Sequence, residues 1–257
     1  MEIIKLWSDS KDNAAVLEYY PTSQKRTKST VVIFPGGGYY ARARHEGEEY
    51  AQFLNSLGMD AFVLQYSVTP KHFPIELIDA RRSIQWIRFN SEKFDINPNG
   101  IGVMGSSAGG HLAALVSTYL NSIETMQEDD IKTESFLPDF QILAYPVITM
   151  ADLSLCDVGS IVNLLGVENL KLAASVDPSR LVNKKTPIAF IWHTSEDQVV
   201  DVRNSLKYAE ALRNNGIVFE LHIFPKGEHG LGLAPQNTHV AQWQKLLERW
   251  LKFNDIL

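Results

Sequence analysis

Short apolar runs alternate along the chain with longer segments whose apolar residues recur at helical spacing. Such runs, when bounded by glycine or proline, are typical of buried strands, whereas the 3.6-residue period indicates amphipathic helices. Strands are predicted over residues 30–34, 59–66, 100–104, 140–145, 188–193 and 217–224. Helices are predicted over residues 46–57, 74–94 and 108–119, then from a cap at Asp201 to Arg213, and over residues 240–253.

This order of elements predicts an α/β fold. Strands that alternate with helices form a mostly parallel sheet with helices on both faces. Residues 3–7 and 14–20 also look like strands, but no helix separates them, so we expect an antiparallel N-terminal edge. We expect one domain over residues 1–257. Residues 146–186 interrupt the alternation, and they form either a lid or substrate wall, or a packed surface excursion.

Composition and charge exclude several classes of protein. The 257 residues carry a net charge of −6 and no long basic run, which argues against a nucleic acid or an anionic membrane as partner. The sequence contains no run of 18 consecutive apolar residues, so we expect no membrane span. The single cysteine, Cys156, cannot form a disulfide within the chain, and the N-terminus does not resemble a signal peptide, so we expect a cytoplasmic protein. No metal-ligand or nucleotide-binding pattern occurs, so we expect no metal and no cofactor.

Small residues gather where the strand at 100–104 gives way to the next helix. Gly105 to Gly109 reads GSSAG and fits the G-x-S-x-G pattern of a nucleophile elbow, which needs a strand before it and a helix after it. The sharp turn would expose the hydroxyl of Ser107 above the sheet. It would also aim the N–H of Ala108 at a developing oxyanion. The alternative is a turn of small residues that packs a helix closely on the sheet.

A base and an acid for Ser107 follow two later strands. His229 lies in a glycine-flanked loop after the last strand, which suits a general base. Glu196 and Asp197 are adjacent carboxylates after the strand at 188–193, and either could orient the base. The resulting order of serine, carboxylate and histidine is that of α/β-hydrolases. Two other histidines have structural interpretations: we expect His193 to brace the loop that follows it, and His111 to pack beneath the elbow.

The loop after the strand at 30–34 carries three glycines, which let backbone N–H groups approach a substrate. Gly37 and Gly38 are therefore candidates for the oxyanion hole, although a plain tight turn would have the same composition. Tyr39 and Tyr40 follow. Their rings could offer a stacking face to a sugar, or they could simply pack the loop.

The chain resembles an α/β-hydrolase of the acetyl esterase and lipase type. More narrowly, it resembles the bacterial acetylxylan esterase-like and feruloyl/acetyl esterase-like group. The motifs that carry this resemblance are FPGGGYY (34–40), RHEGEEYAQFL (44–54), GSSAGGHLAA (105–114), TPIAFIWHTSEDQVV (186–200) and PKGEHGLGLA (225–234). The resemblance implies an α/β-hydrolase fold, in which Ser107 is the nucleophile, Asp197 the acid and His229 the base. It also implies that Gly37, Gly38 and Ala108 form the oxyanion hole.

One departure concerns substrate class. Relatives of the hormone-sensitive lipase carry a histidine before the glycines, where this chain has Pro35. The resemblance therefore implies hydrolysis of short-chain acyl esters, with acetylated sugars or oligosaccharides as the expected small-molecule substrates. The same three residues would also serve an amide hydrolase of the peptidase or formamidase kind. A non-catalytic binding protein with this fold is a third interpretation, although such proteins usually lack a member of the triad.

Overall fold

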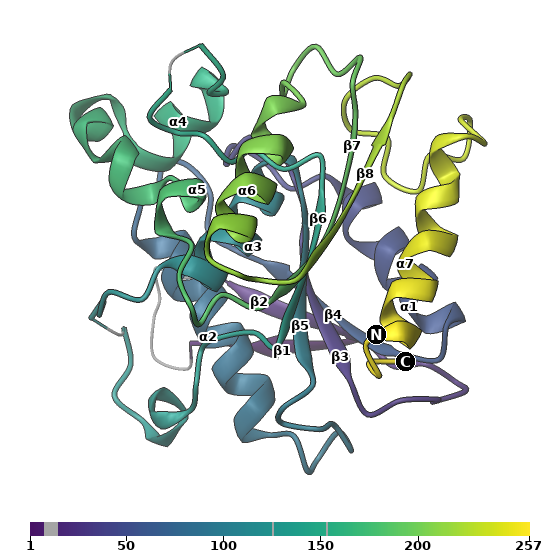
Figure 1. Ribbon diagram of the computed structural model, residues 1–257. Coiled ribbons are helices and arrows are strands. Elements are labelled where there is room, and N and C mark those ends of the chain that lie inside the picture. The colour runs from purple at the N-terminus through teal and green to yellow at the C-terminus, as the bar shows by residue number, and fades with distance from the viewer. Residues whose placement is uncertain (8–14, 125, 153) are drawn as a thin grey trace.

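A mostly parallel sheet forms the centre of the molecule (Figure 1). The computed structural model describes residues 1–7, 15–124, 126–152 and 154–257, and within them the sheet has eight strands in the order β1-β2-β4-β3-β5-β6-β7-β8. The strands are β1 (Glu2–Lys5), β2 (Val16–Tyr20), β3 (Thr30–Phe34), β4 (Asp60–Gln65), β5 (Ile101–Ser106), β6 (Phe140–Ala144), β7 (Ile188–Thr194) and β8 (Phe219–Phe224). β1–β2 and β2–β4 pair antiparallel and all later pairs are parallel, which confirms the predicted fold class.

Five helices, α1, α2, α3, α6 and α7, lie where the periodicity predicts them, with shifted ends, whereas α4 and α5 lie in the 146–186 segment. They are α1 (Glu48–Ser56), α2 (Ile75–Phe89), α3 (Ser107–Thr118), α4 (Val158–Leu165), α5 (Pro178–Leu181), α6 (Arg203–Asn214) and α7 (Trp243–Phe253). The 3₁₀ segments are η1 (Arg44–Glu46), η2 (Asp130–Thr133), η3 (Val167–Val176) and η4 (Val240–Gln242). The predicted extension of α2 to residue 94 is wrong. Asn90 ends this helix, because its backbone leaves the helical region and its side-chain amide donates to the carbonyl of Trp86 at 2.8 Å.

Two apolar layers, one on each face, hold the sheet between its helices. Successive side chains of a strand point to opposite faces, so in β3 Val32 packs with the layer of α2, α3 and α6. Val31 and Ile33 pack with the layer of α1 and α7. Figure 1 shows these two groups of helices on opposite sides of the sheet. All five residues of β3 are buried, as a strand covered on both faces requires.

The carboxyl ends of the parallel strands meet along one edge of the sheet. β3, β5, β6, β7 and β8 run in the same direction, so the segments that follow them lie at this edge. Ligands of open α/β sheets bind at this edge. Ser107 directly follows β5, and Tyr145 directly follows β6. One further loop follows β7, and the loop that carries His229 follows β8.

The segment at 146–186 leaves the same edge after β6 and contains α4, η3 and α5. Asp157 caps α4, since its carboxylate accepts the N–H of Ser160 at 3.2 Å. The segment therefore has structure of its own, beside the edge where the site residues gather (Figure 1).

Three further properties concern the described part of the chain. None of its helices has the length and apolar character needed to cross a membrane. In the same residues, no group of three or more His, Cys, Asp or Glu side chains is arranged to hold a metal ion. The thiol of Cys156 is free and half-buried.

The carboxyl group of Glu76 is buried in the first turn of α2. No described residue forms a hydrogen bond with either of its oxygens. Burial, with a smaller contribution from the nearby Asp79, raises the pKa of Glu76 to about 8 from its ordinary value of 4.5. The folded protein therefore keeps this group neutral over a pH range in which the unfolded chain ionises it.

We predict that Glu76 makes folding less favourable as pH rises. Between about pH 4.5 and 8 the unfolded chain releases this proton and the folded chain does not. The free energy of unfolding therefore falls across that window and stays lowered above it. Glu76→Gln should remove this dependence and stabilise the protein at pH 8.5 by roughly 2–4 kcal/mol relative to wild type.

Urea unfolding at half-unit pH steps measures this effect. Glu49→Gln, at an exposed position of α1, is the control and should leave the pH dependence as in wild type. Wild-type and Glu76→Gln curves that run parallel from pH 5 to 8.5 would contradict the prediction.

Candidate active site

Ser107 lies at a sharp turn between β5 and α3. Its backbone φ is +53°, in the left-handed region that residues other than glycine rarely adopt. The neighbouring elements approach so closely that a Cβ on Gly109 would lie 1.9 Å from the carbonyl oxygen of Phe34. A Cβ on Gly105 would lie 2.1 Å from the carbonyl oxygen of Gly109. The G-x-S-x-G spacing thus has a steric cause, and it places the serine at the N-terminus of α3, where negative charge is favoured.

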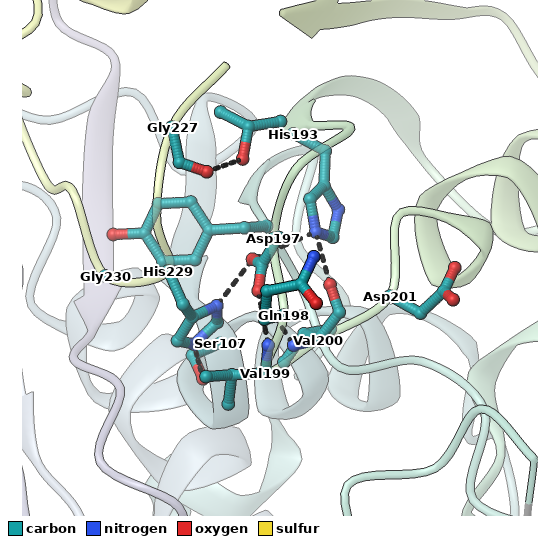
Figure 2. A network of polar contacts seen from close by, with 12 residues as sticks. Ser107, His193, Asp197, Gln198, Val199, Val200, Asp201, Gly227, His229 and Gly230 are labelled. Atoms are coloured by element: carbon teal, nitrogen blue, oxygen red, sulfur yellow. Dashed lines mark hydrogen bonds and ion pairs between the residues drawn. The ribbon is translucent and has the colours of Figure 1, made fainter. Parts of the chain in front are cut away.

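The imidazole of His229 connects Ser107 to Asp197 (Figure 2). Its Nδ1 lies 2.6 Å from Oδ2 of Asp197, and its Nε2 lies 2.8 Å from Oγ of Ser107. A carboxylate can only accept, so Nδ1 carries the ring proton and donates it to Asp197. Nε2 is then free to accept the hydroxyl hydrogen of Ser107. The structure therefore brings the three predicted residues into one hydrogen-bonded chain.

Asp197 is a buried carboxylate with several donors. Oδ1 accepts the N–H groups of Val199 and Val200, both at 2.9 Å, while Oδ2 faces His229 and lies 3.3 Å from Nε2 of His193 (Figure 2). Burial alone would raise the pKa of this carboxyl. The hydrogen bonds and the imidazole outweigh burial and hold the pKa well below its usual range. Asp197 therefore stays ionised beside His229.

Two neighbours of Asp197 shape the same loop. His193, at the end of β7, braces it as expected: Nε2 donates to the carbonyl of Val200 at 2.9 Å, and Nδ1 accepts from Oγ of Ser205 at 2.8 Å. Glu196 is exposed, and its carboxylate accepts the N–H of Gly227 at 3.2 Å. Of the two adjacent carboxylates, Asp197 faces the imidazole of His229. Glu196 accepts a hydrogen bond from the loop that carries His229.

The glycine loop after β3 lies beside the elbow. Gly37 and Gly38 have φ of +132° and +61°. In the part of the chain that the structure describes, no acceptor is recorded for the N–H groups of Gly37, Gly38 or Ala108. The N–H of Gly36 is different, since it donates to Oε2 of Glu46 at 2.8 Å. Three free N–H groups at the elbow and its neighbouring loop are what an oxyanion hole requires.

The prediction that Tyr39 offers a stacking face is wrong. Its backbone φ is +59°, its ring is fully buried, and its Oη lies 2.6 Å from Nδ1 of His111. His111 lies in α3, as expected beneath the elbow, and its Nε2 contacts the carbonyl of Val176 at 2.7 Å. Tyr40 has an exposed side chain, at 72% of its full surface. Only the second of the two tyrosines is open to a ligand.

The 146–186 segment contacts both the elbow and the glycine loop. The N–H of Val147 donates to the carbonyl of Ser107 at 3.0 Å. In α4, the amide of Asn163 donates to the carbonyl of Gly38 at 2.8 Å. A Cβ on Gly38 would lie 3.8 Å from Oγ of Ser160. The segment thus places the polar side chains of Asn163 and Ser160 beside Gly38.

Two residues of the site were missed by the sequence interpretation. Tyr145 directly follows β6, and its ring packs edge-on against that of His229, with centroids 5.1 Å apart. Its hydroxyl donates to the buried carboxylate of Glu46 at 2.7 Å. The only available signals were the position of Tyr145 at the carboxyl edge and that of Glu46 within the quoted motif RHEGEEYAQFL.

Comparisons with known proteins show the family to which the chain belongs. The family model BD-FAE matches residues 18–212. This chain belongs to the BD-FAE family. It is an acetyl/feruloyl esterase-like α/β-hydrolase, which confirms the resemblance of the sequence motifs.

Three relatives place the chain within that family. An acetyl ester-xyloside bifunctional hydrolase from Caldicellulosiruptor lactoaceticus has a similar structure, with a TM-score of 0.93 and 41% identity over 100% of this chain and 97% of that one. The acetylxylan esterase of Xylanibacter ruminicola is 34% identical over 86% of this chain and 45% of its own length. Endo-1,4-beta-xylanase B of Butyrivibrio fibrisolvens is 36% identical over 80% of this chain and 33% of its own length. The chain therefore spans less than half the length of either curated relative.

The two adjacent carboxylates give a test of the site. We predict that Asp197→Asn lowers kcat for an acetyl ester by about 10²–10⁴-fold, because an amide at this position favours the wrong tautomer of His229. Glu196→Gln changes charge equally at the neighbouring position and should keep kcat within about threefold of wild type. Steady-state kinetics with matched melting temperatures decide between them, and the reverse ranking would assign the role to Glu196.

Proposed function

We propose that the protein is a serine ester hydrolase that removes acetyl groups from sugars or oligosaccharides. The observation that carries this proposal is the continuous chain from Ser107 through His229 to Asp197 beside three free N–H groups. A serine next to a histidine of fixed tautomer is the arrangement of acyl-transfer enzymes.

The first half-reaction forms an acyl-enzyme. Oγ of Ser107 attacks the ester carbonyl while Nε2 of His229 takes the hydroxyl proton. Asp197 is held ionised and so stabilises the imidazolium that forms. Nε2 then gives the proton to the departing sugar oxygen, the carbon–oxygen bond of the ester breaks, and the acetyl group stays on Ser107.

The N–H groups of Gly37, Gly38 and Ala108 stabilise the negative oxygen of the tetrahedral intermediate. Such donors act most strongly when they are already oriented before the charge develops. In the second half-reaction, water gives a proton to His229 and attacks the acyl carbonyl. Acetate leaves and Ser107 regains its hydrogen.

Two observations support an acetylated sugar as substrate. The C. lactoaceticus relative is an acetyl ester-xyloside bifunctional hydrolase, and the X. ruminicola relative is an acetylxylan esterase. The wall that α4 places beside Gly38 is formed by the polar side chains of Asn163 and Ser160, which suits a short acyl group and a polar alcohol better than an alkyl chain. The exposed ring of Tyr40 is the remaining candidate for a sugar-stacking surface.

We predict that Ser107→Ala lowers kcat for acetyl esters by at least about 10³-fold with no loss of folding. A serine-directed phosphonate should label wild type at Ser107 and should leave the adjacent Ser106 unlabelled, because Ser106 is buried and its Oγ faces Tyr50. Fragment mass spectrometry of the labelled peptide locates the adduct. Near-normal turnover by Ser107→Ala would show that the proposed function is wrong.

We also predict a graded preference for short acyl groups. One methylene changes transition-state binding in such a site by about 1–3 kcal/mol, so kcat/KM should fall from two- to four- to eight-carbon acyl esters without an abrupt cutoff. Acetylated xylose should be a better substrate than a simple alkyl acetate. A maximum at eight carbons would contradict the sugar-ester proposal and favour a lipase-like enzyme.

A further inference from the structure

The carboxylate of Glu46 links the glycine loop to Tyr145, the residue that follows β6. Its side chain is buried at 3% exposure. Oε2 accepts the N–H of Gly36, in the glycine loop, at 2.8 Å, and Oε1 accepts the hydroxyl of Tyr145 at 2.7 Å. A charge buried in this way is costly unless donors compensate it. The two donors come from segments that are 10 and 99 residues away along the chain.

The link continues from Tyr145 into the loop that carries His229. The hydroxyl oxygen of Tyr145 accepts the N–H of Gly232 at 2.9 Å, while its ring packs against the imidazole of His229. His45, the residue before Glu46, adds a second tie because its Nε2 donates to the carbonyl of Gly230 at 3.0 Å. The histidine loop is therefore held at Gly230 by His45 and at Gly232 by Tyr145, which in turn is bonded to Glu46.

The same network reaches the strand beneath the nucleophile. Oη of Tyr50 lies 2.9 Å from Oγ of Ser106 and 3.4 Å from Oη of Tyr145. Both tyrosines are fully buried, and burial, together with the charge of Glu46, raises the pKa of each phenol above its ordinary value. They therefore stay neutral and can donate. The strand before the elbow, the glycine loop and the histidine loop therefore each form a hydrogen bond with a side chain of this cluster.

We propose that Glu46 is a positioning residue, which fixes the distance between the oxyanion donors and His229 through its bonds to Gly36 and Tyr145. This inference rests on the proposed function. The bond at Gly36 orients the glycine loop so that the next two N–H groups, those of Gly37 and Gly38, stay free. The bond at Tyr145 holds the surface on which the imidazole rests. Neither bond contacts substrate, so the role is exerted through the groups that do.

Hydrogen-bonding geometry, more than charge, should then matter at this position. A glutamine can accept from Gly36 through its carbonyl oxygen and donate to the oxygen of Tyr145 through its amide. Alanine can do neither and leaves the buried hydroxyl and N–H unpaired. We expect Glu46→Gln to keep kcat within about fivefold of wild type. Glu46→Ala should lower it by about 10²-fold with KM changed less than about threefold, since a small misplacement acts on the transition state.

The experiment separates a change in rate from a loss of folded enzyme. Active sites are counted by burst titration with a phosphonate, and kcat for an acetyl ester is expressed per titrated site. A merely structural role lowers the number of sites, whereas a positioning role lowers the rate per site. The low-field proton resonance of the His229–Asp197 hydrogen bond should also move in Glu46→Ala. Glu49→Gln (exposed) and Glu76→Gln (buried, on α2) are the controls, and both should turn over per site as wild type does.

Tyr145→Phe provides an independent variant. It cuts the link to the histidine loop and leaves the Gly36 bond, so we expect a per-site rate about tenfold below wild type. Adding this change to Glu46→Ala should cost little more, because both remove the same connection. If Glu46→Ala does not fold, Tyr145→Phe decides the question by the same measurements.

The outcomes distinguish this inference from the proposed function. If the phosphonate labels Ser107 but Glu46→Ala, or Tyr145→Phe in its place, turns over within threefold of wild type per site, the positioning role is overturned and the esterase proposal stands. If the phosphonate does not label wild-type Ser107, both are overturned.

Discussion

The left-handed backbone at Ser107 is the constraint on which the rest of the site depends. A non-glycine residue in this region costs of order 1–3 kcal/mol and persists only where the surroundings hold it. Here β5 and α3 are buried along almost their whole length, and the glycines on either side allow contacts that any Cβ would block. The core on both faces of the sheet therefore supports a conformation that the serine would not adopt alone. The same turn presents the carbonyl of Ser107 to Val147, so the 146–186 segment is anchored at the nucleophile as well.

Two buried carboxyl groups have pKa values shifted in opposite directions. Asp197 meets two backbone N–H groups and two imidazoles, so its pKa is held low in spite of burial. Glu76 meets no donor among the described residues, so burial raises its pKa to about 8. Desolvation acts in the same direction on both groups, and the donors decide the outcome. Ionisation is thus maintained where the proposed mechanism needs it, at the end of the chain that passes through His229.

The fold and the three central residues of the site could be predicted because their signals are local. Alternating periods identify the strands and helices, the spacing around Ser107 identifies the turn, and a parallel sheet gathers the loops after β7 and β8 at one edge. Other features depend on contacts that sequence does not encode locally. The ring of Tyr39 lies against His111, a partner 72 residues away along the chain, and its backbone is left-handed. Neither feature can be recognised from the local sequence. The end of α2 depends on one side-chain bond from Asn90, within a pattern whose apolar spacing continues to residue 94.

The glycine loop illustrates why preorganisation needs partners outside the loop. Glycines give it the freedom to adopt φ values that aim N–H groups at a substrate, but the same freedom would let the loop relax. Glu46 accepts the N–H of Gly36, and Asn163 of α4 donates to the carbonyl of Gly38. The peptide groups between these two bonds are those whose N–H groups remain free. An oxyanion that forms there meets donors that need no reorientation, which is the condition under which such donors contribute most. One helix of the 146–186 segment therefore contributes to this restraint through Asn163.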